Sequence, residues 1–255
     1  MAQENKKRVV YTCLTGNYDN LIPLSYVDHD WDYICFTDNP ALLKQQKSGI
    51  WNIRPLVFNN LNDSKNNRWH KIHALDILSE HYESIYIDAN VNILTSYLFD
   101  MLKYNKKDIL IPLHHARDCI FSECEVVISN DKDSEKVCRD QIDYIRSKGF
   151  PVHYGLNENN IIYRKHQNRK TRKLMTEWWQ LIEKYSTRDQ LSLSYVLWNN
   201  GIKIKEISFP NIRNDKVNFR IEAHTRKWKG KLFYKEILPS GRKRLFVLGK
   251  KICSY

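Results

Sequence analysis

An Asp and an Asn stand two residues apart where a short apolar run ends, in the stretch Asp88-Ala89-Asn90. The run before them, 84–87, is rich in β-formers and predicts a strand. Side-chain oxygens with this spacing at a strand end can bind Mg²⁺ or Mn²⁺, or the hydroxyls of a ribose. Asp and Asn also favour turns. The residue types therefore leave two interpretations open, a ligand clamp and an ordinary strand end.

Three basic side chains, Lys65, Arg68 and Lys71, are spaced three residues apart near the start of a predicted helix. That helix is indicated by N-cap residues at 62–64 and by an apolar stripe at helical spacing, Trp69, Ile72, Leu75 and Leu78. Lys71 falls at the edge of the stripe on the helical wheel. It can therefore be a phosphate-binding group or a lysine that extends its ammonium out of an apolar surface.

Two imidazoles and a guanidinium follow the predicted strand 108–113, at His114, His115 and Arg117. Such a group at a strand end suits substrate binding. No Ser or Cys nucleophile motif accompanies it. We therefore place His115 and Arg117 among the candidate catalytic residues.

Asp189 and Gln190 lie in the first turn of a helix that Ser186-Thr187 is predicted to cap. The helix dipole by itself favours an acidic residue there. The functional alternative is a carboxylate that orients an acceptor hydroxyl or acts as a general base. Both interpretations remain open.

His224 follows the sequence FRIEA in a polar, basic stretch. Folded back onto the sheet edge, it could be a third metal ligand or a phosphate donor. The C-terminal segment 242–255 alternates basic and apolar residues. That pattern suits contact with an anionic membrane surface and, equally, a terminal strand with solvated flanks.

The elements that must position these residues alternate between strands and helices. Strands are predicted at 8–15, 31–37, 51–58, 84–90, 108–113, within 151–164, and at 203–209; helices are predicted from 62 to about 78, at 132–148, at Arg169–Tyr185 and after Ser186-Thr187. This order predicts an α/β sandwich with a mostly parallel sheet. In such sheets ligands bind beyond the carboxyl ends of the strands. The polar strand ends would then share one edge: Thr15–Asp19, Asp38-Asn39, Asp88–Asn90 and His114-His115.

Composition narrows the class of protein. The chain has 255 residues, 42% of them hydrophobic, which is enough for one compact domain with an extension. The formal net charge of +12 would attract a phosphorylated substrate, nucleic acid or an anionic membrane. Six cysteines without a CxxC pair, and no apolar stretch of membrane-spanning length, argue against a disulfide scaffold and a spanning helix. With no signal-peptide core at the N-terminus, we expect a reducing, cytoplasmic compartment.

Six blocks of sequence resemble, in this order, the DUF616 family: VVYTCLTGNYD, DYICFTDN, NRWHKIHALDIL, SIYIDANVNI, HARDCIFSE and TRDQLSLSYVLW. The resemblance covers about residues 8 to 225. It implies a glycosyltransferase-like protein of the kind found in bacterial surface-polysaccharide loci and among plant proteins linked to cell-wall polysaccharides. It also implies a GT-A-like, Rossmann-type α/β/α sandwich that binds a nucleotide-sugar at its strand ends.

The resemblance assigns roles to the residues above. Thr15, Gly16 and Tyr18 would cradle the nucleotide, Asp38 would meet its base or ribose, and the three basic residues of the predicted helix would face phosphate. Asp88-Ala89-Asn90 occupies the place of the Asp-x-Asp of GT-A enzymes, so that Asp88, Asn90 and His224 would hold Mn²⁺ or Mg²⁺. Asn90 departs from the second Asp, which puts metal dependence in question. Asp189-Gln190 resembles the acidic helix start that holds sugar or acceptor.

The resulting prediction is a glycosyltransferase that moves a sugar, from UDP by preference, to a hydroxyl of a capsule or O-antigen acceptor. Displacement would occur at the anomeric carbon, with Asp189 as base if the reaction inverts. The alternatives are a non-catalytic nucleotide-sugar or glycan-binding module, a nucleic-acid-binding protein and a nucleotidyltransferase. We predict a catalytic domain at 1–225 and a basic extension at 226–255 that contacts the inner face of the cytoplasmic membrane.

Overall fold

The computed structural model describes residues 7–16, 18–223, 233–237, 243–247 and 250–254. The strands are β1 (Lys7–Leu14), β2 (Asp32–Thr37), β3 (Lys47–Ser48), β4 (Trp51–Pro55), β5 (His81–Ile87), β6 (Val91–Ile93), β7 (Ile109–Pro112), β8 (Ile161–Lys165), β9 (Ser208–Phe209), β10 (Phe219–Ile221), β11 (Phe233–Ile237), β12 (Lys243–Val247) and β13 (Lys250–Ser254). The helices are α1 (Pro40–Gln45), α2 (Asp63–Ile72), α3 (Ala74–Ile77), α4 (Tyr97–Lys103), α5 (Ile120–Ser129), α6 (Glu135–Ser147), α7 (Arg169–Lys184) and α8 (Gln190–Asn199), with the 3₁₀ helix η1 at Ile204–Glu206.

The central sheet has eight strands in the order β3-β4-β2-β1-β5-β8-β7-β9. The pairs β1–β2, β1–β5, β2–β4 and β7–β9 are parallel. Only β3 and β8 run against their neighbours. The predicted α/β class with a mostly parallel sheet is therefore confirmed.

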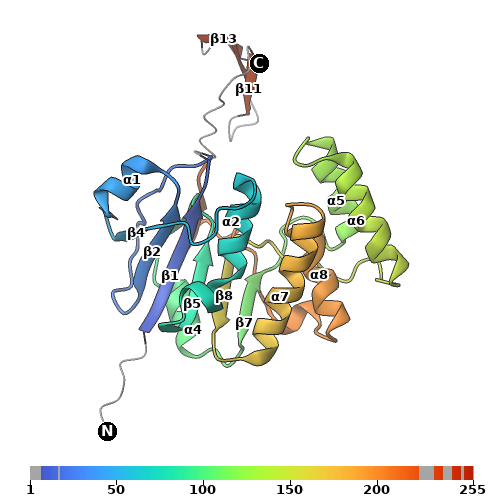
Figure 1. The fold of residues 1–255 in the computed structure, drawn as a ribbon, viewed down its shortest axis with the longest axis horizontal. Helices are drawn as coiled ribbons and strands as arrows, with labels where there is room; N and C mark the ends of the chain where they lie inside the picture. The colour runs from blue at the N-terminus through green and yellow to red at the C-terminus, as the bar shows by residue number, and fades with distance from the viewer. Residues whose placement is uncertain (1–6, 17, 224–232, 238–242, 248–249, 255) are drawn as a thin grey trace.

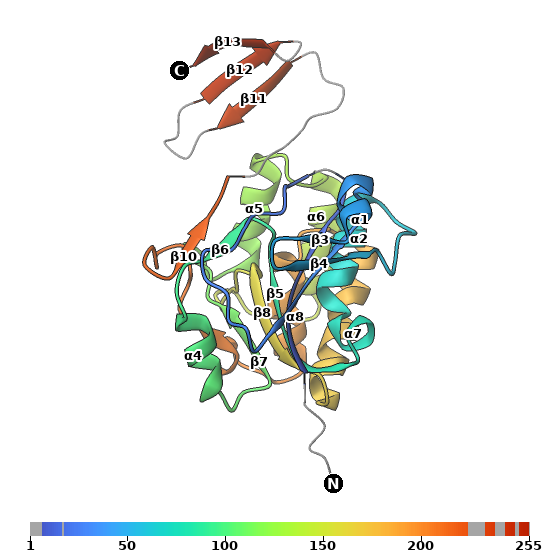
Figure 2. The ribbon, with the colours of Figure 1, turned by 90° about the vertical axis from the view of Figure 1, so that its left-hand side faces the viewer.

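Each face of this sheet is covered by its own apolar layer. On one face the core joins alternate strand residues such as Val9 and Tyr11 to α2, α3, α5, α6, α7 and α8. On the other face it joins Val10 and Tyr33 to α4, β6 and β10. Figure 2 shows these two layers on opposite sides of the sheet. Because strand side chains alternate, one buried strand serves both layers.

A guanidinium fixes the end of α2 from inside the core. Arg164 on β8 is fully buried, and its Nη1 donates to the carbonyl of Ile72 at 3.1 Å. Its Nη2 bonds to the Tyr11 hydroxyl, which donates to the carbonyl of Lys71 at 2.8 Å. A cation at the carbonyl end of a helix is favoured by the helix dipole. These contacts hold the last turn of α2, and Lys71 with it, against the sheet.

Most predicted elements are present, with shifts at their ends. The long helix predicted up to residue 78 is divided at His73 into α2 and α3, and its N-cap, Asn62, accepts a bond from the amide of Lys65 at 2.9 Å. The helix predicted after Ser186-Thr187 begins at Gln190 with Asp189 as its N-cap, so the predicted caps are wrong. Helix α5 was not expected from the sequence.

The strand predicted at 203–209 is largely wrong, because 204–206 form η1 and only Ser208–Phe209 are a strand. Ile204 and Ile207 are both buried, and a spacing of three matches a 3₁₀ turn. The Ser208 hydroxyl donates to the carbonyl of Ile204 at 2.7 Å and closes that turn. In the C-terminal segment, β11, β12 and β13 pair in antiparallel order. Within the described ranges, no helix has the length and apolar character needed to span a membrane.

Candidate functional site

The polar strand ends do meet at one edge of the sheet, as predicted. β1, β2, β5 and β7 all end there, because they are parallel to one another directly or through β8. The antiparallel strand β8 begins there, since Ile161 pairs with Ile87 at the end of β5. Figure 1 shows these strands side by side, with α2 and α7 in front of them. Residues before β8 therefore belong to the same edge as residues after β5 and β7.

The loop after β1 is held by two neighbouring elements. The Thr15 hydroxyl donates to the carbonyl of Asp63 at 2.8 Å, and the amide of Gly16 donates to both carboxylate oxygens of Asp38 at 3.2 and 3.0 Å. Gly16 has a positive φ of 63°. A Cβ there would lie 2.0 Å from Asp63 Oδ2, so only glycine fits. Tyr18 is 44% exposed beside this loop. The loop that we predict to bind the nucleotide is thus held in place by hydrogen bonds to Asp38 and Asp63.

Two cations and two carboxylates form an ion cluster where α2 meets β5 and α8. Lys71 Nζ lies 2.7 Å from Asp189 Oδ2 and 3.5 Å from Asp88 Oδ1. Arg68 Nε lies 3.4 Å from Asp189 Oδ2 and donates to the carbonyl of Thr187 at 3.2 Å. The ammonium of Lys71 also lies 5.0 Å from the ring centre of Tyr86. The structure thus brings four predicted site residues together.

The members of this ion cluster differ in their exposure to a ligand. The side chains of Lys71 and Asp189 are 2% and 5% exposed, whereas that of Asp88 is 34% exposed. Burial by itself raises the pKa of Asp189, but Lys71 and Arg68 outweigh it and lower the pKa to about 2. Asp189 is therefore a firmly ionised anchor for two cations. Asp88 and Arg68, whose side chain is 20% exposed, are the members that can contact a ligand directly.

Lys65, Ala89 and Gln190 lie at the margins of this arrangement. Lys65 Nζ donates to the carbonyl of Glu183 at 2.6 Å, so it binds α7 instead of joining the ion cluster. Ala89 is 9% exposed between Asp88 and Asn90. Gln190 is half-buried as the first residue of α8.

Asn90 ties two segments together at the entrance of a groove. Its Nδ2 donates to the carbonyl of Glu222 at 2.9 Å, and the amide of Glu222 donates to the carbonyl of Asn90 at 2.8 Å. The groove has a volume of about 460 Å³ and lies between the 19–25 segment and the β6–β10 pair. Asn90 and Asn92 line it together with Arg220.

The described residues fit a divalent cation poorly. Asp88 is a single carboxylate that already faces the ammonium of Lys71, and the side-chain oxygen of Asn90 is uncharged. A hard cation prefers several charged oxygens. Over the described ranges, no group of three His, Cys, Asp or Glu side chains is placed to hold a metal ion. His224, the predicted third ligand, lies outside the described residues.

The residues after β7 form a second polar group. Arg117 Nε lies 2.5 Å from Glu123 Oε2. His115 Nδ1 lies 3.7 Å from Oε2 of Glu158, and the other carboxylate oxygen of Glu158 pairs with Arg213. The two imidazole rings of His114 and His115 are 4.7 Å apart. His115 and Arg117 are therefore each paired with a different buried glutamate.

The two histidines of this group have different accessibility. His114 Nδ1 accepts from the amides of Arg117 and Ala116 at 2.9 and 3.2 Å, and burial lowers its pKa to about 4. His115 is 33% exposed. Burial, followed by Arg213 and Arg117, lowers the pKa of His115 against the opposing effect of Glu158. Both rings are neutral at pH 7, and only that of His115 can reach a ligand.

Two asparagines at this edge were missed in the sequence analysis. Asn159 and Asn160 precede β8 and are 3% and 6% exposed, yet neither side-chain nitrogen nor oxygen has a hydrogen-bond partner among the described residues. The amide of Asp88 donates to the carbonyl of Asn160 at 2.8 Å, which places the pair next to the end of β5. Buried polar atoms without partners are unfavourable by about 1–3 kcal/mol each. The polar run 157–160 before an apolar strand was the signal in the sequence.

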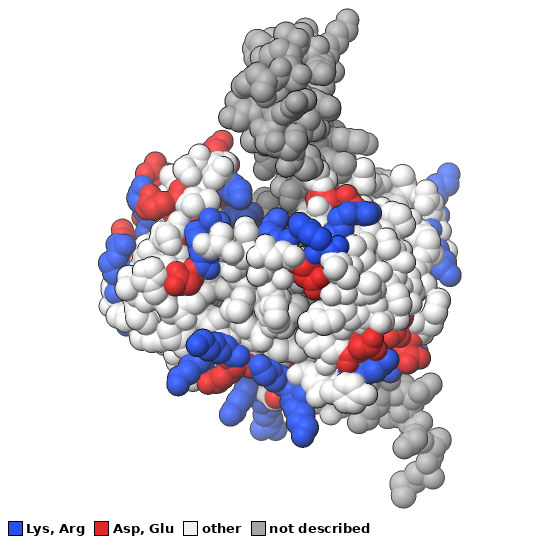
Figure 3. Space-filling view, turned by 180° about the vertical axis from the view of Figure 1, so that it is seen from behind, with Lys and Arg blue, Asp and Glu red and all other residues white. Residues whose placement is uncertain are grey.

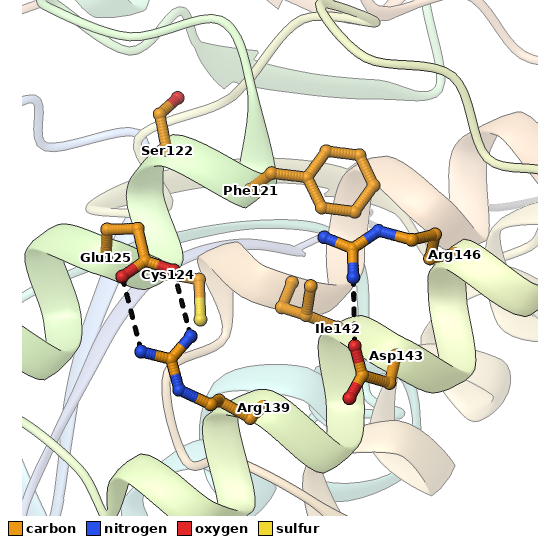
Figure 4. A pocket seen from close by; sticks show the side chains of 8 residues that line it. All are labelled: Phe121, Ser122, Cys124, Glu125, Arg139, Ile142, Asp143 and Arg146. Carbon is orange, nitrogen blue, oxygen red and sulfur yellow. Dashed lines mark hydrogen bonds and ion pairs between the residues drawn. The ribbon is translucent and has the colours of Figure 1, made fainter.

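A separate cavity lies between α5 and α6, away from these strand ends. Its volume is about 320 Å³, and Figure 4 shows Arg139 and Arg146 on its wall. Arg139 Nη1 pairs with Glu125 at 3.1 Å and Arg146 Nη1 with Asp143 at 2.9 Å. Both cations are thus engaged, and we assign this cavity no role.

Comparisons with known proteins identify the family of this chain. A family model described as TOD1/MUCI70, glycosyltransferase-like domain, matches residues 2–220. Mouse xyloside xylosyltransferase 1, in its apo form, is similar over 80% of this chain and 84% of that chain, at 13% identity and a TM-score of 0.43. The apo WbbM bifunctional glycosyltransferase is similar over 83% of this chain and 40% of that chain, at 10% identity and a TM-score of 0.45. At these sequence identities and TM-scores, the two similarities support no conclusion about fold or activity. No curated protein matches the sequence significantly.

Proposed function

The chain belongs to the TOD1/MUCI70 glycosyltransferase-like family, and from this membership we propose that it transfers a sugar from a nucleotide-sugar donor to a hydroxyl group. The match at 2–220 includes every strand end of the candidate site. The glycosyltransferase-like character expected from the DUF616 resemblance is confirmed. Its donor, its acceptor and the roles of its residues are proposals.

The observation that carries the proposal is the edge formed by the end of β5 and the start of β8. Asp88 offers an exposed carboxylate there, and the buried carboxamides of Asn159 and Asn160 have no partners among the described residues. Hydroxyl groups of a sugar or ribose, which both donate and accept, would satisfy all three side chains. We place the donor's sugar and ribose at this edge, with the nucleotide extending toward Gly16 and Asp38.

The donor's diphosphate needs a positive group, and Arg68 is best placed to supply one. Its guanidinium is within electrostatic reach of both Asp88 and Tyr18, so it links the end of β5 to the loop after β1. Arginine suits phosphate because its donors form a planar fork. Lys71 is buried between two carboxylates and acts as a support. We infer that the diphosphate is neutralised by the protein, with a divalent cation as a lesser contributor.

The acceptor hydroxyl requires a base, and the geometry favours His115 over Asp189. A carboxylate with a pKa near 2 is a weak proton acceptor, and Asp189 is buried behind Lys71. His115 is neutral, partly exposed and oriented by Glu158. In the proposed step His115 takes the hydroxyl proton as the acceptor oxygen bonds to the anomeric carbon. The bond from that carbon to phosphate breaks, and the nucleotide leaves as an anion.

The cellular setting follows from the resemblance alone. We propose a UDP-sugar donor, a surface-polysaccharide acceptor such as capsule or O-antigen, and action at the inner face of the cytoplasmic membrane. The basic extension at 226–255 is the segment proposed to contact that membrane, outside the catalytic domain at 1–225.

Two alternatives predict different behaviour. A non-catalytic binding module would bind the nucleotide-sugar without releasing nucleotide. A nucleic-acid-binding protein would need a continuous basic surface. On the face in Figure 3, Lys and Arg lie in separate groups with Asp and Glu among them. On this face, therefore, the described residues form no continuous basic surface of the kind that a nucleic-acid strand needs.

The proposal is tested by the release of nucleotide from UDP-, GDP- and CMP-sugars, measured chromatographically with Mn²⁺, with Mg²⁺ and with EDTA. We expect release from one donor in all three conditions. His115→Asn should lower the rate about 100-fold or more, which is the usual contribution of a general base. His153→Asn is the matched control, because His153 is 68% exposed and its one ion pair among the described residues is with Asp118. No release from any donor, or equal rates for the two variants, would contradict the proposal.

A further inference from the structure

Four cations from segments far apart in the sequence act on one another: Arg117 and Arg213 lie near His115, and Lys132 and Arg188 lie near them. Arg117 precedes α5, Lys132 follows it, Arg188 precedes α8 and Arg213 follows β9. Arg117 and Arg213 are joined through Glu123, His114, His115 and Glu158. Lys132 is adjacent to Asp133, which accepts from the Ser186 hydroxyl at 2.7 Å and from the amide of Thr187 at 2.8 Å. We call Arg117, Lys132, Arg188 and Arg213 the outer basic cluster.

Electrostatic effects show that these side chains share one environment. Loss of water around its ammonium lowers the pKa of Lys132, and so does repulsion from Arg188, Arg117 and Arg213, against the attraction of Glu123. The three arginines of the cluster thus all repel the ammonium of Lys132. Arg188 also lowers the pKa of Asp189, so the outer basic cluster borders the ion cluster at α2.

The outer basic cluster carries more positive than negative charge. Arg117 and Arg213 are matched by the buried carboxylates of Glu123 and Glu158. Lys132 is next to Asp133, which accepts hydrogen bonds from Ser186 and Thr187. Arg188 acts on Asp189, which is already paired with Lys71 and Arg68. Arg188 Nε is buried and has no acceptor among the described residues. A guanidinium nitrogen buried without an acceptor is a position where an anion would be stabilised.

We propose that the outer basic cluster binds an acidic substituent, a carboxylate or a phosphate, on the sugar that accepts the transferred residue. The sheet order separates this site from the donor's diphosphate. β7 lies two strands from β5 and β9 lies three strands away, which at about 4.8 Å per strand is about 10–14 Å. A sugar ring fits between the two, with its hydroxyl near His115. This specificity rests on the proposed transferase function, and it makes the acceptor an anionic glycan.

The test uses calorimetric titration of the full chain with four probes: trigalacturonic acid, maltotriose, glucose 6-phosphate and UDP. We expect one acidic probe to bind at least about tenfold more tightly than maltotriose, since a hydrogen bond to a charged group supplies that much. Arg188→Gln should remove this advantage and leave the Kd for UDP unchanged, while Arg188→Lys should retain most of it. The acidic probe whose affinity falls identifies the group as carboxylate or phosphate.

Two further variants keep the test informative if Arg188→Gln does not fold. Lys132→Gln removes a charge from the exposed part of the outer basic cluster and should weaken the same acidic probe. Arg146→Gln is the matched control, because its side chain is 62% exposed on α6. Equal affinity for acidic and neutral probes, or equal loss in Lys132→Gln and Arg146→Gln, would overturn the inference. A loss of UDP affinity alone in Arg188→Gln would assign the cations to the donor and overturn it too.

The inference and the proposed function fail in different ways. If no nucleotide binds while an acidic probe binds through Arg188, the transferase proposal falls and the anion site stands. If nucleotide binds and is turned over while acidic probes bind no better than maltotriose, the transferase stands and the anion site falls.

Discussion

Lys71, which the sequence analysis predicted to face phosphate, lies buried and pairs with two carboxylates of the protein. Its position at the edge of an apolar stripe was visible in the sequence, but its partners were not. In the structure its ammonium lies between Asp189 and Asp88 and over the ring of Tyr86. Removing either partner of an ion pair buried to this degree destabilises the protein, because the remaining charge is left uncompensated.

Replacing Asp189 by Asn should therefore destabilise the protein by about 3 kcal/mol at pH 7. Chemical denaturation monitored by fluorescence measures the free energy of unfolding. Asp140→Asn is the matched control, since Asp140 pairs with Lys136 at an exposed i,i+4 position. That control should change stability by less than about 0.5 kcal/mol.

The effect of Asp189→Asn on the free energy of unfolding should depend on pH. The folded pKa of Asp189 is lowered to about 2, below the value of about 3.9 in an unfolded chain. Its stabilising contribution is thus complete above pH 4 and lost as the pH falls through 2. The difference between wild type and Asp189→Asn should be constant at neutral pH and shrink below pH 4. Equal stability of the two proteins at pH 7 would contradict the buried ion pair.

His115 predicts the pH dependence of transfer. Its pKa is lowered below 6.5, so the neutral base is the main form throughout the neutral range. We expect the rate at saturating substrate to be flat near pH 7 and to fall only in mildly acidic solution, with a midpoint below 6.5. A steady-state pH profile measures this, and a midpoint above 7 would exclude His115 as the base.

At the scale of elements, the loop after β1, which packs against the start of α2, depends on one glycine. Gly16→Ala places a methyl group against Asp63, while Gly49→Ala, at a similar φ of 59°, meets nothing within 4 Å. Both variants pay about 1 kcal/mol for the left-handed backbone. Only Gly16→Ala should also displace Asp63 and weaken nucleotide binding by tenfold or more, on the order of 1.4 kcal/mol. Parallel titrations of both variants with nucleotide measure the difference. Identical affinities would remove this loop from the donor site.

The elements also show what the sequence could and could not predict. The runs at 8–15, 31–37 and 84–90 are apolar and end in polar residues, so their strands and their shared edge were predictable. The antiparallel direction of β8 was not, because local pattern carries no information on strand direction. Asn159 and Asn160 were therefore overlooked, although they begin a strand at that same edge. The strand predicted from the alternation in 203–209 was largely wrong, because burial of Ile204 and Ile207 favours a 3₁₀ turn over a strand.

At the scale of the whole molecule, three histidines of the described residues have a pKa lowered to about 4 and predict sensitivity to acid. Burial lowers the pKa of His70, His114 and His166 to about 4 each. In an unfolded chain they would take up protons near pH 6.5, so stability is complete above 6.5 and is lost as the pH falls toward 4. Each shift is worth about 1.4 kcal/mol per pKa unit. Denaturation at a series of pH values should show most of this loss between pH 6 and 4. A free energy of unfolding that is independent of pH in that range would contradict the neutral, buried rings.

The central claim is that the edge formed by β1, β2, β5 and β8 binds a nucleotide-sugar through protein groups. Calorimetric titration of the full chain with UDP, GDP and CMP and one sugar derivative of each, in EDTA, tests it most directly. We predict that one pair binds with a Kd of roughly 1 µM–1 mM, the usual range for substrates. We further predict that replacing Asn159 and Asn160 by Ala weakens binding of the nucleotide-sugar more than binding of the free nucleotide. If no nucleotide or nucleotide-sugar binds, with EDTA or with added Mn²⁺, the edge is not a donor site.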